Sequence, residues 1–164
     1  MLVILPPSET KSDGGAGAPL DLDTLAFPEL NPIRKRIGEA LVALSSDLDA
    51  SRRALGLGAT QLAEADRNAD LWLSPTRPAI ERYTGVLYDA LDHRSLTRAG
   101  KTKAADRLAI GSALFGVVRS SDMIPAYRLS GGSKLPGMRT LAAEWKPDLS
   151  DALDAVDDFV VDLR

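Results

Sequence analysis

The sequence contains no cysteine and only one histidine, His93, among its 164 residues. Without cysteine the chain cannot form disulfides, thiolate metal sites or a cysteine nucleophile. One histidine cannot build a multi-histidine metal centre, and it argues against a histidine-based catalytic triad. The carboxylates are scattered along the chain and form no recognisable iron site. We therefore expect no metal site and no cofactor.

Long apolar runs and an excess of positive charge are also missing. No segment approaches the roughly 20 apolar residues that cross a membrane, and no export signal precedes the first strand. We therefore expect a cytoplasmic protein with no membrane partner. The formal net charge is -3, which argues against a surface coated with positive charge for nucleic acid, although a local basic cleft is compatible with it.

The chain does have enough apolar material for one domain spanning residues 1–164, because 45% of its residues are hydrophobic. Strands are expected at residues 2–5, 107–112 and 159–163, the last of them buried, with a further extended segment at 124–129. Helices are expected from Asn31 as N-cap, from about Ala59, and over 77–91, 141–145 and 149–153. The first helix is expected to carry Arg34 on its solvent face. This alternation predicts an α/β (mixed α+β) fold with a central mixed sheet flanked by helices.

The most informative segment follows the first strand and reads Pro6-Pro7-Ser8-Glu9-Thr10-Lys11. Each proline fixes φ and removes a backbone donor, so the polar side chains that follow are held in place. The carboxyl ends of strands are where open α/β sheets bind ligands. The segment therefore indicates either a ligand site or a solvated turn. The glycine spacing of a P-loop is absent, and a Ser8–Lys11 nucleophilic pair is a further alternative.

Three other features can likewise be interpreted either as a binding site or as a purely structural element. Leu55-Gly56-Leu57-Gly58 has the pattern of a helix-hairpin-helix turn, whose amides bind a phosphate, or it is a plain helix connection. The segment from Arg119 to Arg128 can clamp an anion, or an internal Arg–Asp pair can staple its loop. Gly85, inside the expected helix over 77–91, predicts a close approach of another backbone or a ligand.

Several segments together resemble the YaaA, or peroxide stress resistance, family. They are Leu5-Pro6-Pro7-Ser8-Glu9-Thr10-Lys11, Tyr83-Thr84-Gly85-Val86-Leu87-Tyr88, Gly111 to Arg119, Asp122 to Leu129, and Val160-Val161-Asp162-Leu163. They occur in the family's order and cover nearly the whole chain. The subtype is most similar to actinobacterial members.

The resemblance implies a cytoplasmic bacterial protein of mixed α/β fold that supports survival of hydrogen peroxide by limiting damage from unincorporated iron. It also implies double-stranded DNA as a partner, bound in a basic cleft with a helix-hairpin-helix element. The hairpin carries over onto Gly56 and Gly58, and the cleft onto Lys11, Arg82, Arg119 and Arg128. Family members continue beyond a final strand such as this one, so we expect a C-terminal segment of the family to be missing.

Two functions follow as expectations. The first is an oxidative-stress protein that binds DNA weakly and without sequence preference, with an affinity that falls steeply with salt. The alternative is an enzyme or binding protein for a small anionic metabolite, in which Arg119 clamps the anion, Asp122 orients Arg119, and Lys11 or a tyrosine transfers protons. The pocket candidates are Ser8, Lys11, Tyr83, Tyr88, Arg119, Asp122 and Tyr127. A structural domain without activity is a third alternative, and the sequence predicts no oligomeric state.

Overall fold

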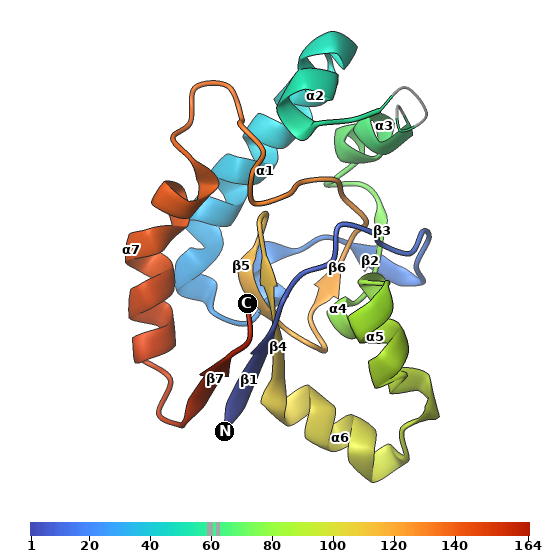
Figure 1. Ribbon diagram of the computed structural model, residues 1–164, viewed down its shortest axis with the longest axis vertical. Coiled ribbons are helices and arrows are strands. Elements are labelled where there is room, and N and C mark those ends of the chain that lie inside the picture. The colour runs from blue at the N-terminus through green and yellow to red at the C-terminus, as the bar shows by residue number, and fades with distance from the viewer. Residues whose placement is uncertain (59–60, 62) are drawn as a thin grey trace.

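Two sheets organise the chain in the computed structural model, which describes residues 1–58, 61 and 63–164 (Figure 1). The larger sheet has the order β5-β4-β1-β7, and the smaller has the order β2-β3-β6. The strands are β1 (Leu2–Leu5), β2 (Gly17–Pro19), β3 (Pro75–Pro78), β4 (Leu108–Ser112), β5 (Gly116–Arg119), β6 (Met123–Ile124) and β7 (Val160–Asp162). β1 runs parallel to β4 and β7, whereas β5 is antiparallel to β4. The expected mixed α/β fold with a central mixed sheet is confirmed.

Helices lie on both sides of the larger sheet, with α1 and α7 on one side of the molecule and α5 and α6 on the other (Figure 1). The helices are α1 (Asn31–Ser45), α2 (Leu48–Leu55), α3 (Ala63–Ala69), α4 (Ala79–Arg82), α5 (Val86–Leu91), α6 (Arg98–Arg107) and α7 (Leu141–Asp154), with 3-10 turns η1 (Leu22–Thr24), η2 (Pro28–Leu30) and η4 (His93–Ser95). Within the described part of the chain, each helix is too short or too polar to cross a membrane.

The long amphipathic helix α1 shows how the pattern of the sequence produces the core. Ile33, Ile37 and Leu41 recur with helical spacing and are buried. The prediction that Arg34 lies on the solvent face of α1 is wrong, because this residue is only 1% exposed. Its guanidinium donates to the backbone oxygens of Phe115 and Val117, and burial lowers the pKa of Arg34 to about 10. Arg34 therefore links α1 by hydrogen bonds to the start of β5.

Three other element predictions need correction. Residues 77–91 do not form one helix, because β3 and α4 come first and Gly85 adopts a φ of +105° before α5 begins. Residues 141–153 form one helix, α7, with Pro147 inside it. The strand at 159–163 lies at an edge of the sheet, and the preceding Phe159 is 71% exposed. The helix expected from about Ala59 begins outside the described residues, and its described part starts at Ala63.

Candidate functional site

The two segments that follow β1 and α4 are paired along the carboxyl end of β1. Ser12 N–H donates to the Arg82 carbonyl at 2.8 Å, and Thr84 N–H donates to the Thr10 carbonyl at 3.2 Å. Between these bonds, Lys11 and Tyr83 form an antiparallel bridge. Because β4 runs parallel to β1, its carboxyl end reaches the same region. The edge that open α/β sheets use for ligands is therefore where these polar segments meet.

The Lys11 side chain turns back over this edge. Its Nζ donates to the carbonyl oxygens of Ser8 at 3.0 Å and Glu9 at 3.2 Å. The nitrogen lies 4.2 Å from the ring centroid of Tyr127 and 5.2 Å from that of Tyr83. Among the described residues no carboxylate lies within ion-pair distance of this nitrogen. The amine is therefore held by neutral groups.

This environment lowers the pKa of Lys11 from 10.5 to about 7, chiefly because burial removes water from the ammonium and secondly because Arg128 is close. Glu64 and Glu9 act in the opposite direction. The two aromatic faces and the two carbonyl acceptors favour the charged form, each face by about 2 kcal/mol or more where water is excluded. They act against the desolvation that lowers the pKa of Lys11. Near neutral pH the site thus holds an amine that can exchange its proton.

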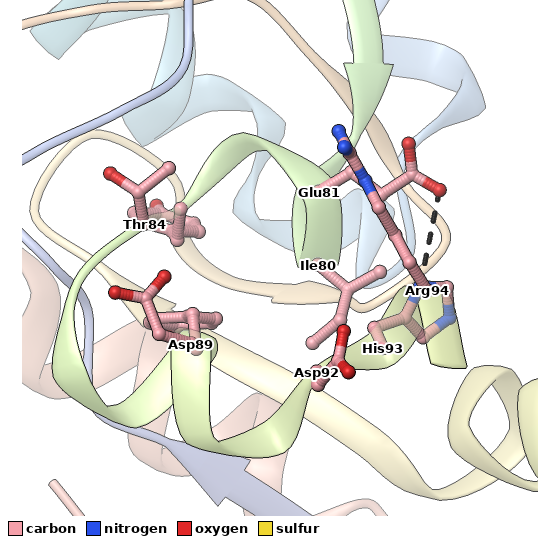
Figure 2. Close-up of a pocket in the computed structure, with 9 residues that line it drawn as sticks. Ile80, Glu81, Thr84, Asp89, Asp92, His93 and Arg94 are labelled. Atoms are coloured by element: carbon pink, nitrogen blue, oxygen red, sulfur yellow. Dashed lines mark ion pairs between the residues drawn. The ribbon is translucent and has the colours of Figure 1, made fainter. Parts of the chain in front are cut away.

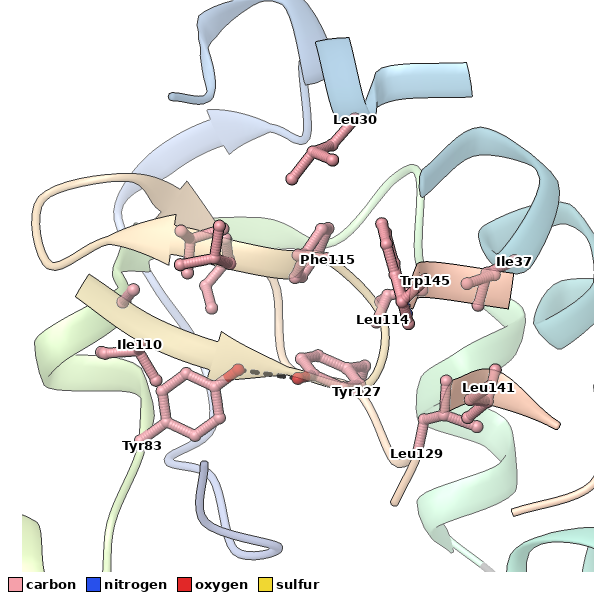
Figure 3. Close-up of a cluster of buried hydrophobic side chains, with 14 of the residues drawn as sticks. Leu30, Ile37, Tyr83, Ile110, Leu114, Phe115, Tyr127, Leu129, Leu141 and Trp145 are labelled. Carbon is pink, nitrogen blue, oxygen red and sulfur yellow. Dashed lines mark hydrogen bonds between the residues drawn. The ribbon is translucent and has the colours of Figure 1, made fainter. Parts of the chain in front are cut away.

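A chain of hydroxyl groups lies beneath the amine. The Tyr127 hydroxyl is 2.7 Å from that of Tyr83 and 2.8 Å from Ser112 Oγ. Figure 3 draws the bond between the two tyrosines as a dashed line. Ser112 Oγ also accepts the Phe115 N–H at 3.0 Å. Both tyrosines are almost completely buried, and burial raises the pKa of each hydroxyl above its ordinary value. The phenols stay protonated at neutral pH and can relay a proton along the chain.

Tyr88 and Gly85 fix the position of the segment that follows β1. The Tyr88 hydroxyl donates to the Pro6 carbonyl at 2.7 Å, and its ring stacks on Tyr83 with centroids 5.6 Å apart. Gly85 has a φ of +105°, and a Cβ on it would lie 3.2 Å from Ser8 Oγ. The close approach predicted at Gly85 is thus made by the side-chain hydroxyls of Ser8 and Thr10 instead of by another backbone. A larger residue there would push against the polar segment.

The predicted Ser8–Lys11 nucleophilic pair is not assembled. Ser8 Oγ lies 3.2 Å from Thr10 Oγ1, while Lys11 Nζ bonds the backbone oxygen of Ser8. No hydrogen bond joins the Ser8 hydroxyl to an amine among the described residues. The remaining nucleophile of this segment is the Lys11 nitrogen itself.

A small cavity lies next to the groups that hold the amine, but the Lys11 side chain does not line it. It has a volume of about 140 Å³ and is lined by Pro7, Ser8, Glu9, Ala113, Tyr127, Leu129, Ser130 and Gly131. Arg128, only 11% exposed, donates to Glu9 Oε2 at 3.0 Å, and Asn68 bonds its backbone on both sides. Glu9 is 65% exposed, so water competes for its carboxylate. Glu9 lines the cavity, whereas Arg128 does not.

Arg119 and Asp122 lie away from this cavity. The antiparallel register places Ser112 opposite Gly116 and Ala109 opposite Arg119, so Arg119 is at the far end of β5. The Asp122 carboxylate accepts the N–H groups of Arg119 and Ala26, and burial raises its pKa. Asp122 therefore fixes its own loop through backbone N–H groups, while the Arg119 guanidinium donates to the Asp106 carbonyl at 2.9 Å, so the alternative of an Arg–Asp side-chain pair is not formed among the described residues. The seven pocket candidates do not line one pocket.

The predicted DNA-contacting residues are also dispersed. Arg82 is fully buried and donates to the backbone oxygens of Ile124, Ser12 and Pro75, and burial lowers its pKa to about 10. The Gly56 N–H donates to the Arg52 carbonyl, and the Gly58 N–H donates to Gln61 Oε1 at 2.9 Å. Gly56 ends α2 with a left-handed conformation, as in an ordinary glycine cap. In this conformation the two amides of the turn already have acceptors.

A second cavity of about 380 Å³ lies on the other side of Tyr83 and Tyr88, between α4, α5 and η4 (Figure 2). Glu81, Asp89, Asp92 and Arg94 line it together with His93. His93 Nδ1 lies 3.9 Å from Glu81 Oε1 and has no hydrogen-bond partner among the described residues. No group of three metal-ligating side chains forms anywhere in residues 1–58, 61 and 63–164. Sequence reasoning missed this cavity because it lies within the segment expected to be one helix.

Sequence reasoning also missed Ser112 and the Glu9–Arg128 pair. Ser112 lies at the end of β4, in a segment quoted for its family resemblance, and this position was the available signal. The pairing of Glu9 with Arg128 joins residues 119 positions apart, and neither residue type predicts such a partner.

Comparison with known proteins completes the description of the site. The whole chain aligns with a UPF0246 protein of Corynebacterium efficiens at 55% identity and with one of Corynebacterium glutamicum at 50%, covering 66% of each. A UPF0246 protein of Streptomyces coelicolor is 45% identical over the whole chain, which covers 64% of it. The chain thus spans about two thirds or less of these relatives. Residues 1–164 match the family described as peroxide stress protein YaaA, and the chain belongs to this family.

Proposed function

We propose that the chain binds and acts on a small anionic metabolite at the Lys11 site, as part of its role in a peroxide stress family. One observation carries the proposal. The Lys11 nitrogen is desolvated over two tyrosine rings at the carboxyl end of β1, beside a cavity and a buried arginine. A partly buried cation that has no ion-pair partner among the described residues is costly for the fold. Such an arrangement is typical of a functional site.

The size and charge of the site limit its ligand. A cavity of about 140 Å³ is smaller than the 300–1,000 Å³ of pockets that take drug-sized ligands. Among the described residues, the positive charge of Arg128 pairs only with the exposed Glu9 carboxylate. Both features favour a compact anion with few heavy atoms.

DNA binding through the turn that follows α2 stays a prediction. The observation in its favour is that Arg52 and Arg53 are exposed beside Gly56. Phosphate binding there would require Gln61 to release the Gly58 amide. The mechanism predicts anisotropy changes on a labelled duplex that disappear between low and moderate salt.

The two proposals differ in which residues matter for peroxide survival. We would complement a bacterial strain that lacks the gene with the wild-type chain, with Lys11→Met, or with the double variant Arg52→Ala/Arg53→Ala. We expect Lys11→Met to lose protection and the double variant to keep it. Lys35→Met is the matched control, because Lys35 is exposed on α1 and pairs only with Glu39 at 3.9 Å. Full protection by Lys11→Met would contradict the metabolite proposal.

A further inference from the structure

The cavity between α4, α5 and η4 contains a buried nitrogen atom that has no partner. His93 Nδ1 is buried and makes no hydrogen bond among the described residues. Glu81 Oε1 lies 3.9 Å away, which is too far for a hydrogen bond (Figure 2). In the neutral tautomer with its proton on Nε2, Nδ1 is an acceptor. A group that donates to both Nδ1 and Glu81 would satisfy the two acceptors at once, and a buried polar atom left unpaired is costly.

Carboxylates dominate the charge of this cavity. Glu81, Asp89 and Asp92 line it, against Arg94 as the one positive side chain in the described lining (Figure 2). Arg94 also lines the neighbouring groove beside β3, so it lies at the border of the cavity. Asp92 is the C-cap of α5, where negative charge is unfavourable, and Asp89 precedes it by three residues, where like charges repel. No cation lies within ion-pair distance of Asp89 or Asp92 in residues 1–58, 61 and 63–164. Fold stability therefore does not explain this concentration of carboxylates.

We propose that this cavity binds a small organic ammonium ion, whose N–H groups donate to Glu81 Oε1 and His93 Nδ1. An ammonium group has three donors and no acceptor, which makes it complementary to carboxylates and an unprotonated imidazole nitrogen. The cavity volume of about 380 Å³ lies within the 300–1,000 Å³ of small-molecule pockets. A metal ion fits less well, because no group of three metal-ligating side chains converges in the described part of the chain. The cavity is separate from the Lys11 site, so this inference goes beyond the proposed function.

The rest of the lining favours a ligand with a short apolar body. Ile80, Tyr83 and Tyr88 line the cavity together with the charged groups. The two tyrosine rings are stacked with their centroids 5.6 Å apart, and aromatic faces attract organic cations. Their hydroxyls are already bonded to Tyr127 and to the Pro6 carbonyl. The tyrosines therefore offer mainly their rings, which suits a primary amine on a short carbon chain better than a hydrated inorganic cation.

The single histidine of the chain gives a direct test, because its imidazole signals need no assignment variant. The chain, labelled with ¹⁵N in histidine, would be titrated with butylammonium chloride in exchange for sodium chloride at constant pH and ionic strength. A second titration would use 1-butanol, which has the same carbon chain without the charge. We expect butylammonium to shift the His93 Nδ1 signal to saturation, with an affinity at least about tenfold above that of 1-butanol, because its donors are charged.

Variants locate the binding site. Glu81→Gln should weaken butylammonium binding at least about tenfold, because it removes the charge from one of the two acceptors. Asp89→Asn/Asp92→Asn should weaken it about threefold, because these exposed carboxylates act through solvent. Glu29→Gln is the matched control and should leave the affinity unchanged, since Glu29 is exposed on η2 and does not line the cavity.

Three outcomes would overturn the inference. The first is an equal response of the wild-type chain to butylammonium and 1-butanol, a result that needs no variant to fold. The second is an Nδ1 signal that moves with neither probe, which would leave an ordered water as the group between His93 and Glu81. The third is an affinity of Glu81→Gln equal to that of Glu29→Gln, because the ammonium would then bind elsewhere.

Discussion

Removing the Tyr127 hydroxyl breaks the buried chain at its centre. In Tyr127→Phe the Tyr83 hydroxyl loses its partner at 2.7 Å, while Ser112 Oγ keeps the N–H of Phe115. Leaving one buried hydroxyl unsatisfied costs about 2 kcal/mol of unfolding free energy. Tyr88→Phe is the matched control, because among the described residues the Tyr88 hydroxyl bonds only the Pro6 carbonyl. Loss of this hydroxyl should lower the unfolding free energy by about 1 kcal/mol.

A double-mutant cycle isolates the contact between the two hydroxyls. Tyr83→Phe should cost about 1 kcal/mol of unfolding free energy, less than Tyr127→Phe, because the Tyr127 hydroxyl keeps Ser112 Oγ whereas Tyr127→Phe strands the Tyr83 hydroxyl. The double variant strands neither, so it should cost at least about 1 kcal/mol less than the sum of the singles. Urea unfolding followed by tryptophan fluorescence gives these free energies if the m-value stays constant. Additivity of the two single variants would refute the hydroxyl chain.

Three further predictions follow from named contacts. Between pH 7 and 10.5 the unfolded state binds more protons at Lys11 than the folded state does, so the unfolding free energy of the wild type should rise by up to about 1.4 kcal/mol per pH unit from this group. Urea titrations at several pH values should show no such slope for Lys11→Met. Equal pH dependence of the two proteins would contradict the lowered pKa. Gly85→Ala should lower the unfolding free energy by about 2 kcal/mol in the same assay. Gly131→Ala is the control and should lower it little, because Gly131 has open space around it and no positive φ. Equal losses in the two variants would count against the close approach at Gly85. Arg82→Met should lower the unfolding free energy by about 3 kcal/mol, because one buried and two part-buried carbonyls lose their donor. A loss no larger than that of the exposed Arg52→Met would exclude this role.

The fold was predictable where periodicity reports burial. The apolar run of β1 and the spacing of Ile33, Ile37 and Leu41 in α1 gave the correct elements. Arg34 shows where such reasoning ends, because its hydrophilic side chain occupies a core position and is satisfied by carbonyls from β5 and its flanking turn. Pairing between segments distant in the sequence, such as β3 with β6, leaves no local pattern. That is why residues 77–91 were predicted as one helix.

The candidate site was partly predictable for the same reason. Lys11, Tyr83 and Tyr127 were singled out and do converge, since each belongs to a segment at the carboxyl edge of the sheet. Arg119 was grouped with them because it is close to Tyr127 in the sequence. The antiparallel turn from β4 into β5 carries it to the opposite end of the sheet, and only the strand register shows this.

The protonation state of Lys11 is the property on which the proposed function depends most. The most direct measurement is a ¹³C NMR titration of the Lys11 side chain in the folded protein, assigned with Lys11→Met and compared with Lys35. The structure predicts a midpoint at about pH 7 for Lys11. A midpoint near the ordinary lysine value of about 10.4 would contradict the account, because the site would then hold a permanent ammonium and no nucleophile.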